Sequence, residues 1–232
     1  MSKHNLSQAD ELYTGKGRYP ALFGVNGRTG ARVDPTVKLD LGAPDADDAN
    51  GFIETQNLTA LGVASVATPA TAVGAIAEAA LAGVCDVPRN IVGAWTGTAV
   101  LTINGTDEYD EVMSENSASG TSHTGKKAFK TVTDISVSGD VTALTVGTGD
   151  VLGLPYVLTS EQDVLAFYAD STEEKLAATF VAAVGTVATA TTGDIRGTVS
   201  PNTGPDGSVT NVLWTHVQDR GTKQGLVGVS QA

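Results

Sequence analysis

Hydrophobic and polar residues alternate in short runs along most of the chain after residue 90. The runs are rich in β-branched and aromatic residues, which favour strands, and clusters of Gly, Asp, Asn and Pro separate them. The pattern predicts strands over 90–95, 98–103, 106–113, 128–137, 141–146, 151–157, 164–168, 177–184, 187–190, 195–199 and 209–217. Short strands at this spacing are typical of an all-β protein, and we predict an antiparallel β-sandwich or barrel.

Two glycine-containing sequences are predicted to be turns between these strands. Asn104-Gly105 is the strongest short hairpin dipeptide, and it follows directly after the run 98–103. The sequence Gly147-Thr148-Gly149-Asp150 lies between two later runs. We therefore expect the chain to reverse at residues 104–105 and at residues 147–150.

The first 42 residues have no helical periodicity, because glycine or proline interrupts them every few positions. Single apolar residues stand between these breaks, among them Tyr19, Leu22 and Phe23. An extended segment cannot bury such residues by itself, so we expect it to dock them into grooves of its own body or of a neighbour. The alternation of apolar and charged residues over 37–41 predicts a short strand that closes the arm.

This organisation predicts two parts. Residues 1–50 form an extended N-terminal arm and an acidic loop, and residues 51–232 form a β-rich body. The body is either one unit or two subdomains with a boundary near residue 158. At most one or two short helices are expected; residues 71–82 have the best helix propensity, although Gly74 weakens it and leaves a strand open.

Charge is unevenly distributed along the chain, which has a formal net charge of −12. Residues 1–42 carry six basic and four acidic side chains, whereas the remaining residues carry 8 basic and 22 acidic ones. The leader, with Arg18, Arg28 and Arg32, is predicted either to rest on an acidic surface or to be a solvated terminus. The acidic body excludes a nucleic-acid partner. No run approaches the roughly 20 apolar residues that span a bilayer, and the polar start predicts synthesis in the cytoplasm.

Residues with catalytic or metal-binding potential are few. One cysteine and three histidines are too few for a disulfide framework or a confident zinc site. The acidic loop 43–51 does not have the ligand spacing of a calcium-binding EF-hand loop, and residues 147–153 miss the spacing of a dinucleotide-binding fingerprint. We predict no catalytic, cofactor-binding or metal-binding residue, no small-molecule substrate and no enzyme activity. His123 is expected at a solvated loop tip, and His216 at a surface or interface.

The remaining charged and sulfur-containing residues have structural interpretations. Neighbouring carboxylates such as Asp107 and Glu108 are expected on solvated edges and loops, and Cys85 is expected to be a small buried hydrophobe. Three lysines, Lys126, Lys127 and Lys130, form the single basic cluster of the body. This cluster either meets an acidic partner surface or is a solvated strand edge next to a hairpin turn at 125–127.

Five segments resemble virion structural proteins of tailed bacteriophages. They are Asp86–Ile91, Leu101–Tyr109, Gly125–Val132, Val146–Pro155 and the end region made of 190–198 and 201–207. These segments cover about half of the chain and carry packing and turn patterns rather than a catalytic signature. Among such proteins, the chain is most similar to head decoration, or capsid cement, proteins.

The resemblance implies a β-rich protein on the outer surface of the virion head, made in the host cytoplasm. It implies partners in the major capsid protein and in further copies of the chain, most simply as a homotrimer that bridges neighbouring capsomers and stabilises the capsid. We expect the partner interface to include Arg18, Tyr19, Leu22, Phe23, Arg28, Arg32, Lys126 and Lys127.

Two alternatives to decoration remain open. The chain has the β-rich, arm-bearing character of a tail or tube component, whose arms join stacked rings. A carbohydrate-binding adhesin module is a further alternative, in which an exposed Trp95 or Trp214 stacks on a sugar.

Overall fold

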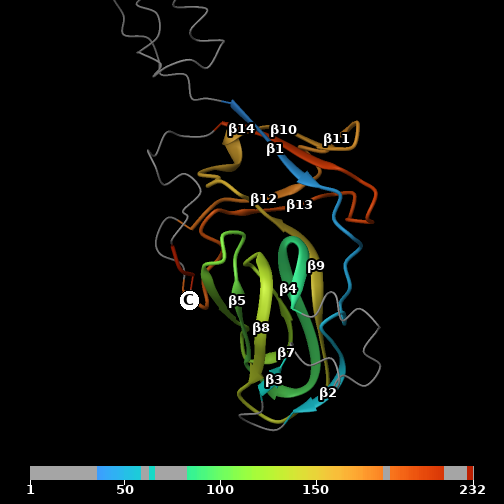
Figure 1. Cartoon of the computed structure of the whole chain (residues 1–232), viewed down its shortest axis with the longest axis vertical. Helices are drawn as coiled ribbons and strands as arrows, with labels where there is room; N and C mark the ends of the chain where they lie inside the picture. The colour runs from blue at the N-terminus through green and yellow to red at the C-terminus, as the bar shows by residue number, and fades with distance from the viewer. Residues whose placement is uncertain (1–35, 59–62, 66–82, 185–188, 217–228, 232) are drawn as a thin grey trace, which may run out of the picture.

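The computed structural model describes residues 36–58, 63–65, 83–184, 189–216 and 229–231. It confirms the predicted all-β class, because nearly all of the regular structure is antiparallel sheet, with two sheets packed as a sandwich (Figure 1). Among the described residues, the only helix is the 3-10 turn η3, Glu161–Asp163. The arm residues 1–35 and the helix candidate 71–82 lie outside the described residues.

The smaller sheet has four strands and combines the first and the last strands of the described chain. Its order is β1-β14-β10-β11. Thr36 at the start of β1 pairs with His216 at the end of β14. The strands are β1 (Thr36–Gly42), β14 (Asn211–His216), β10 (Val164–Ala169) and β11 (Thr172–Glu173). The predicted alternation over 37–41 is confirmed: Leu39 and Leu41 are buried, and the intervening residues are exposed.

The larger sheet has ten strands and contains the central part of the chain. Its main path is β12-β13-β9-β4-β8-β5-β6, with β2 paired to β9, β3 to β8 and β7 to β4. The strands are β2 (Ile53–Leu58), β3 (Val63–Ser65), β4 (Val84–Ala99), β5 (Leu101–Thr106), β6 (Val112–Asn116), β7 (Gly120–Thr124), β8 (Phe129–Val137), β9 (Val141–Gly153), β12 (Thr179–Val181) and β13 (Thr198–Ser200). The chain after residue 158 therefore contributes strands to both sheets.

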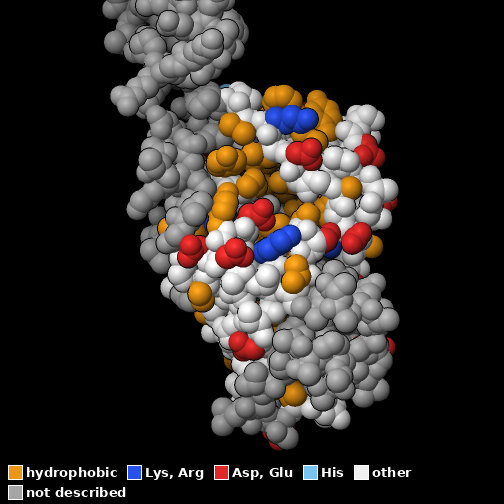
Figure 2. All heavy atoms as spheres, viewed as in Figure 1, with side chains coloured by type: hydrophobic (Ala, Val, Ile, Leu, Met, Phe, Trp, Pro, Cys, Tyr) orange, Lys and Arg blue, Asp and Glu red, His pale blue; other side chains and the backbone are white. Residues whose placement is uncertain are grey.

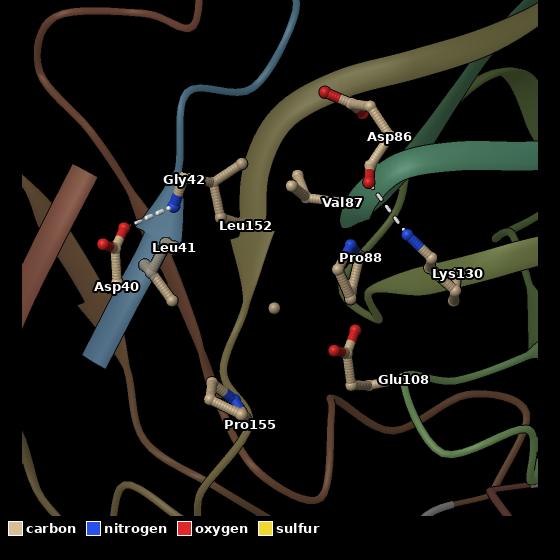
Figure 3. Close-up of a pocket in the computed structure, with 11 residues that line it drawn as sticks. Asp40, Leu41, Gly42, Asp86, Val87, Pro88, Glu108, Lys130, Leu152 and Pro155 are labelled. Carbon is tan, nitrogen blue, oxygen red and sulfur yellow. Dashed lines mark hydrogen bonds between the residues drawn. The ribbon is translucent and has the colours of Figure 1, made fainter. Parts of the chain in front are cut away.

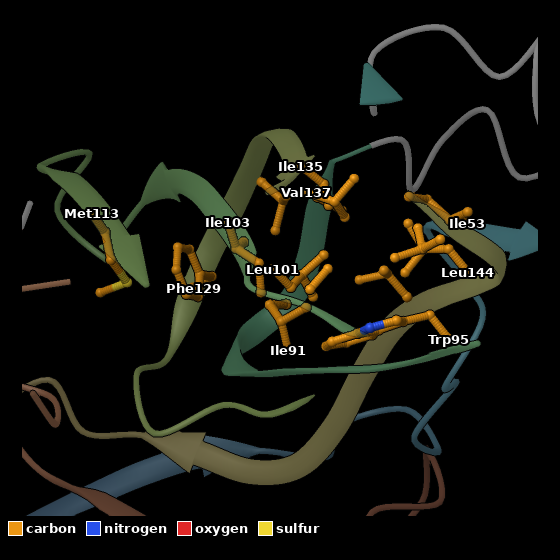
Figure 4. Close-up of a cluster of buried hydrophobic side chains, with 14 of the residues drawn as sticks. Ile53, Ile91, Trp95, Leu101, Ile103, Met113, Phe129, Ile135, Val137 and Leu144 are labelled. Carbon is orange, nitrogen blue, oxygen red and sulfur yellow. The ribbon is translucent and has the colours of Figure 1, made fainter. Parts of the chain in front are cut away.

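Each sheet has its own hydrophobic core. The core of the larger sheet is built from inward-facing residues of β4, β5, β8 and β9, such as Ile91, Leu101, Ile135 and Leu144 (Figure 4). The core of the smaller sheet contains Phe167, whose ring meets that of Phe180 edge to face at 5.7 Å. Leucines at the end of β9 and just after it belong to this second core, so β9 connects the two cores.

The predicted hairpin turn at Asn104-Gly105 is wrong, because both residues lie inside β5. A Cβ atom at Gly105 would lie 1.9 Å from the carbonyl oxygen of Thr131 on β8, so the glycine allows a close approach of two strands. The register between β5 and β8 shifts at this place. The reversal comes later, at a turn in which the carboxylate of Asp107 accepts backbone hydrogen bonds and Asp110 has a φ of 62°.

The predicted turn at residues 147–150 is also wrong, because β9 runs through it. A Cβ atom at Gly147 would lie 1.8 Å from the carbonyl oxygen of Asp48. The acidic loop lies here against β9: the Thr148 amide donates to Asp48 O at 2.8 Å, and the Asp48 amide donates to Thr148 Oγ1 at 3.1 Å. The glycine makes room for a packed loop.

Candidate functional site

A hollow of about 290 Å³ lies between the two sheets (Figure 3). Figure 2 shows hydrophobic side chains gathered between the two ends of the molecule, with acidic and basic side chains near them. One wall is the end of β1, and the opposite side carries Glu108 and Lys130. The lining residues are Asp40, Leu41, Gly42, Asp86, Val87, Pro88, Glu108, Lys130, Leu152, Gly153 and Pro155.

The charged rim of this hollow is dominated by acidic side chains. Lys130 is the one cation among the lining residues, and its Nζ donates to the backbone oxygen of Asp86 at 2.8 Å. The Asp86 carboxylate accepts from Arg89 Nη1 at 3.2 Å. Asp40 accepts the amide of Gly42 at 3.0 Å, and Glu108 is exposed. Asp40 and Glu108 are thus the rim carboxylates with no cationic partner among the described residues.

A smaller hollow of about 60 Å³ lies behind the acidic loop, beside Arg89. Arg89 is 1% exposed, and its Nη2 donates to the carbonyl oxygen of Asp45 at 3.0 Å. Burial raises the pKa of the neighbouring Cys85 thiol to about 12, with a smaller opposing effect of Arg89. The thiol therefore stays protonated near neutral pH and is a poor nucleophile. Cys85 is buried, as expected.

The prediction that Lys127 lies at a partner interface is wrong. It is fully buried, and its Nζ donates to the carbonyl oxygens of Ser114 and Gln231. Burial lowers the pKa of Lys127, against the opposing effects of the Glu115 and Asp194 carboxylates. Its role in the structure is to hold residues 229–231 against β6, where Gln231 forms a parallel bridge with Met113.

Further buried charges continue from Lys127 toward the loop that precedes β13. Arg196 Nη2 donates to Asp107 Oδ2 at 2.7 Å, and the guanidinium lies over the ring of Tyr109 at 5.2 Å. Burial raises the pKa of Asp194, whose carboxylate accepts the amides of Arg196 and Ala128. Asp107 is fully buried, which corrects the expectation of a solvated carboxylate there. We refer to Lys127, Glu115, Asp194, Arg196 and Asp107 as the buried polar framework.

The histidines and tryptophans are placed as follows. His123 lies on β7, is 9% exposed and stands 3.8 Å from Glu115 Oε2, so the expected solvated loop tip is wrong. Trp95 is also buried, and its Nε1 donates to Gly120 O at 2.8 Å. It is therefore unable to stack on a sugar, whereas Trp214 is 38% exposed on the outer side of the small sheet. His216 is half-buried on the same strand.

The other predicted interface residues divide into two groups. Lys126 is exposed, so its side chain remains available at the surface. Its backbone amide donates to Glu115 Oε1 at 2.7 Å. The leader residues Arg18, Tyr19, Leu22, Phe23, Arg28 and Arg32 lie outside the described residues. Sequence reasoning missed the hollow, because its walls come from segments far apart in the chain. The closest signal was the alternation that predicted the strand at 37–41.

No known protein family, curated protein or solved structure matches the chain. In the described part of the chain, no group of three or more His, Cys, Asp and Glu residues is arranged to hold a metal ion. The described helical structure includes nothing long and apolar enough to cross a bilayer.

Proposed function

We propose that the chain is a structural virion protein that decorates the head of a tailed bacteriophage. In this role it bridges neighbouring capsomers as a homotrimer, with the major capsid protein as its partner. The proposal extends the resemblance of the five segments, and the observation that carries it is how these segments contact one another in the fold.

The resembling segments are joined by hydrogen bonds between residues distant in sequence. The Asn90 side chain donates to Gly125 O at 3.2 Å and accepts the Val151 amide at 3.1 Å. The Tyr109 hydroxyl donates to Pro155 O at 2.7 Å. Together with the pair of Arg196 and Asp107, these contacts connect all five segments. The five segments therefore form one connected part of the fold, which is compatible with their acting as a unit.

The fold also suits a protein that resists mechanical separation. DNA packaging stresses the shell outward, and a protein spanning a seam must carry that load through its own body. The long strands β4 and β9 pair over much of their length, and β9 joins the two cores. Several attachments per oligomer give avidity even where each contact is modest. The acidic body is compatible with an exterior position away from packaged DNA.

Heads lacking the protein provide the direct test. We expect purified protein to bind such heads and to raise the temperature at which they release DNA, followed with a DNA-binding dye. The double variant Arg28→Gln with Arg32→Gln is expected to bind more weakly than its matched control, Lys38→Gln with Lys175→Gln. Full heads with the same release temperature in the presence and absence of the protein would contradict cementing. Immunogold labelling along the tail would favour the tail or tube alternative.

A further inference from the structure

The hollow between the sheets borders a strand with an open edge. In the small sheet β14 occupies one edge of β1, and no strand of the described chain pairs with the other. Asp40, Leu41 and Gly42 at the end of β1 form one wall of the hollow (Figure 3). An extended segment that enters here gains both an apolar floor and backbone partners, as in recognition by strand addition.

The chemistry of the hollow defines the segment that fits it. The floor is apolar, with Val87, Leu152 and Pro155, and its volume is at the small end of ligand pockets (about 300–1,000 Å³). Asp40 and Glu108 on the rim favour a cation, because the cations nearby already have acceptors. A short extended segment with a basic residue next to aromatic and aliphatic residues matches both features.

The chain contains such a segment in its own leader. Residues 18–23 read Arg-Tyr-Pro-Ala-Leu-Phe, with the proline favouring an extended backbone. The 12 residues from 24 to 35 separate this segment from β1 and include three glycines. For a glycine-rich chain of this length, the r.m.s. end-to-end span is about 19 Å in general. The distance along β1 from Thr36 to Leu41 is about 17 Å. The effective concentration of a tethered segment at its binding site is highest when the span of the tether matches the distance it must cover, and these two lengths are similar.

We propose that the hollow is the binding site for residues 18–23 of the same chain. Tyr19, Leu22 and Phe23 supply the apolar contacts, and Arg18 pairs with Glu108, while Asp40 across the hollow adds negative charge to the rim. The inference concerns the free protein and holds whether or not the chain decorates a head. Its test therefore uses purified full-length protein and fails independently of the proposed function.

Photo-crosslinking tests this proposal directly. The photoreactive residue p-benzoylphenylalanine replaces Phe23 in one variant and Tyr19 in a second, so that one poorly folded variant does not decide the result. Equal amounts of ¹⁴N- and ¹⁵N-labelled protein are mixed before irradiation, and peptides are mapped by mass spectrometry. We expect crosslinks within one chain to residues that line the hollow. The same probe in place of Leu6 is the control and is expected to give none there.

Charge variants add a second measurement. Asp40→Asn combined with Glu108→Gln is expected to reduce the crosslink yield from position 23 by about threefold, the range of exposed ion pairs. The matched control Glu161→Gln combined with Asp170→Asn, on exposed carboxylates elsewhere, is expected to leave it unchanged. Mixed ¹⁴N–¹⁵N crosslinks would overturn the proposal in favour of a second copy. Crosslinks outside the hollow, or none from either position, would overturn it outright.

Discussion

The two ends of the molecule have differently built interiors. The core beneath the small sheet contains Phe167 and Leu213, with Phe180 of β12 packed against it, and its buried polar residues include one carboxylate, Glu174. The large sheet also has an apolar core, but one side of it carries the buried polar framework, with three carboxylates and two cations. Since hydrophobic packing tolerates small shifts and buried charges do not, the large sheet is expected to fix the geometry of the fold. Burial raises the pKa of Asp194, which expresses the cost of burying its charge, and Arg196 and the amides of Arg196 and Ala128 offset part of that cost.

The largest expected effect comes from removing one partner of a buried ion pair. Arg196→Met leaves the Asp107 carboxylate buried without its cation and is expected to lower the free energy of unfolding by about 3–5 kcal/mol. The exposed residue Lys38 provides a control at the small sheet. Lys38→Met is expected to change the free energy of unfolding by less than about 0.5 kcal/mol. Urea unfolding measures both.

A double variant separates the charge from the packing of the arginine. Asp107→Asn keeps the oxygen that organises the following turn and removes the charge. Added to Arg196→Met, it is expected to restore about 1–2 kcal/mol. Equal stability losses in the single and the double variants would show that the pair acts through packing alone.

The same small substitution at the two ends provides a second comparison. Gly105→Ala places a methyl group against Thr131 O in the large sheet and is expected to destabilise by about 1–3 kcal/mol. A Cβ at Gly204, in the loop beside the small sheet, meets nothing within 4 Å. Gly204→Ala is therefore expected to change the free energy of unfolding by no more than about 0.5 kcal/mol. Thermal unfolding of both variants checks this, and equal losses would contradict the steric explanation.

Lowering the pH is expected to change the contributions of Glu174 and Asp194 to the free energy of unfolding in opposite directions. Burial raises the pKa of Glu174, but hydrogen bonds from Thr203 and Asn202 outweigh it and hold the pKa below the usual value of 4.5. The folded state therefore gains stability above that value and loses it as the pH falls through the lower, folded pKa. Asp194, with a raised pKa, behaves oppositely, so protonation above its usual value of 3.8 adds stability.

Unfolding free energies measured from pH 7 to pH 3 test these signs. Glu174→Gln is expected to destabilise at pH 7 and to converge with the natural chain at low pH. For Asp194→Asn, the difference in unfolding free energy from the natural chain is expected to change with pH in the opposite direction. Parallel curves for all three proteins would contradict the assignment.

The two tryptophans provide the last comparison between the sheets. Trp214 is 38% exposed, so Trp214→Ala is expected to cost about 1 kcal/mol or less. Trp95, which is 5% exposed within the large-sheet core, is the matched comparison, and Trp95→Ala is expected to cost about 3–5 kcal/mol. Denaturant unfolding followed by circular dichroism measures both; a larger loss at Trp214 would reverse the comparison.

The sequence predicted the class of the fold because alternation is a local property. The alternation of Leu39 and Leu41 in β1, and of Ile135 and Val137 in β8, can be recognised from neighbouring residues alone. The glycines were misread for a non-local reason. Gly105 and Gly147 resemble turn residues, but each accommodates the backbone of a segment that is distant in sequence.

The candidate site was less predictable than the fold. Lys126 and Lys127 are identical in type and adjacent, yet one is exposed and the other is fully buried. Both lie in the connection between β7 and β8, and what separates them is the pair of carbonyl acceptors on Ser114 and Gln231, which only the folded chain brings to the Lys127 ammonium. The hollow likewise depends on β1 lying near β9, which no local pattern specifies.

The pairing of β1 with β14 also determines when the small sheet can form during synthesis. Thr36 meets His216, so the four-stranded sheet requires strands from both ends of the described chain. During synthesis β1 leaves the ribosome before the other described strands, and it lacks its neighbour β14 until residue 216 has also emerged. A chain interrupted before Asn211 retains the strands of the large sheet but lacks the hollow's finished wall. The small sheet can therefore close only after translation has passed residue 216.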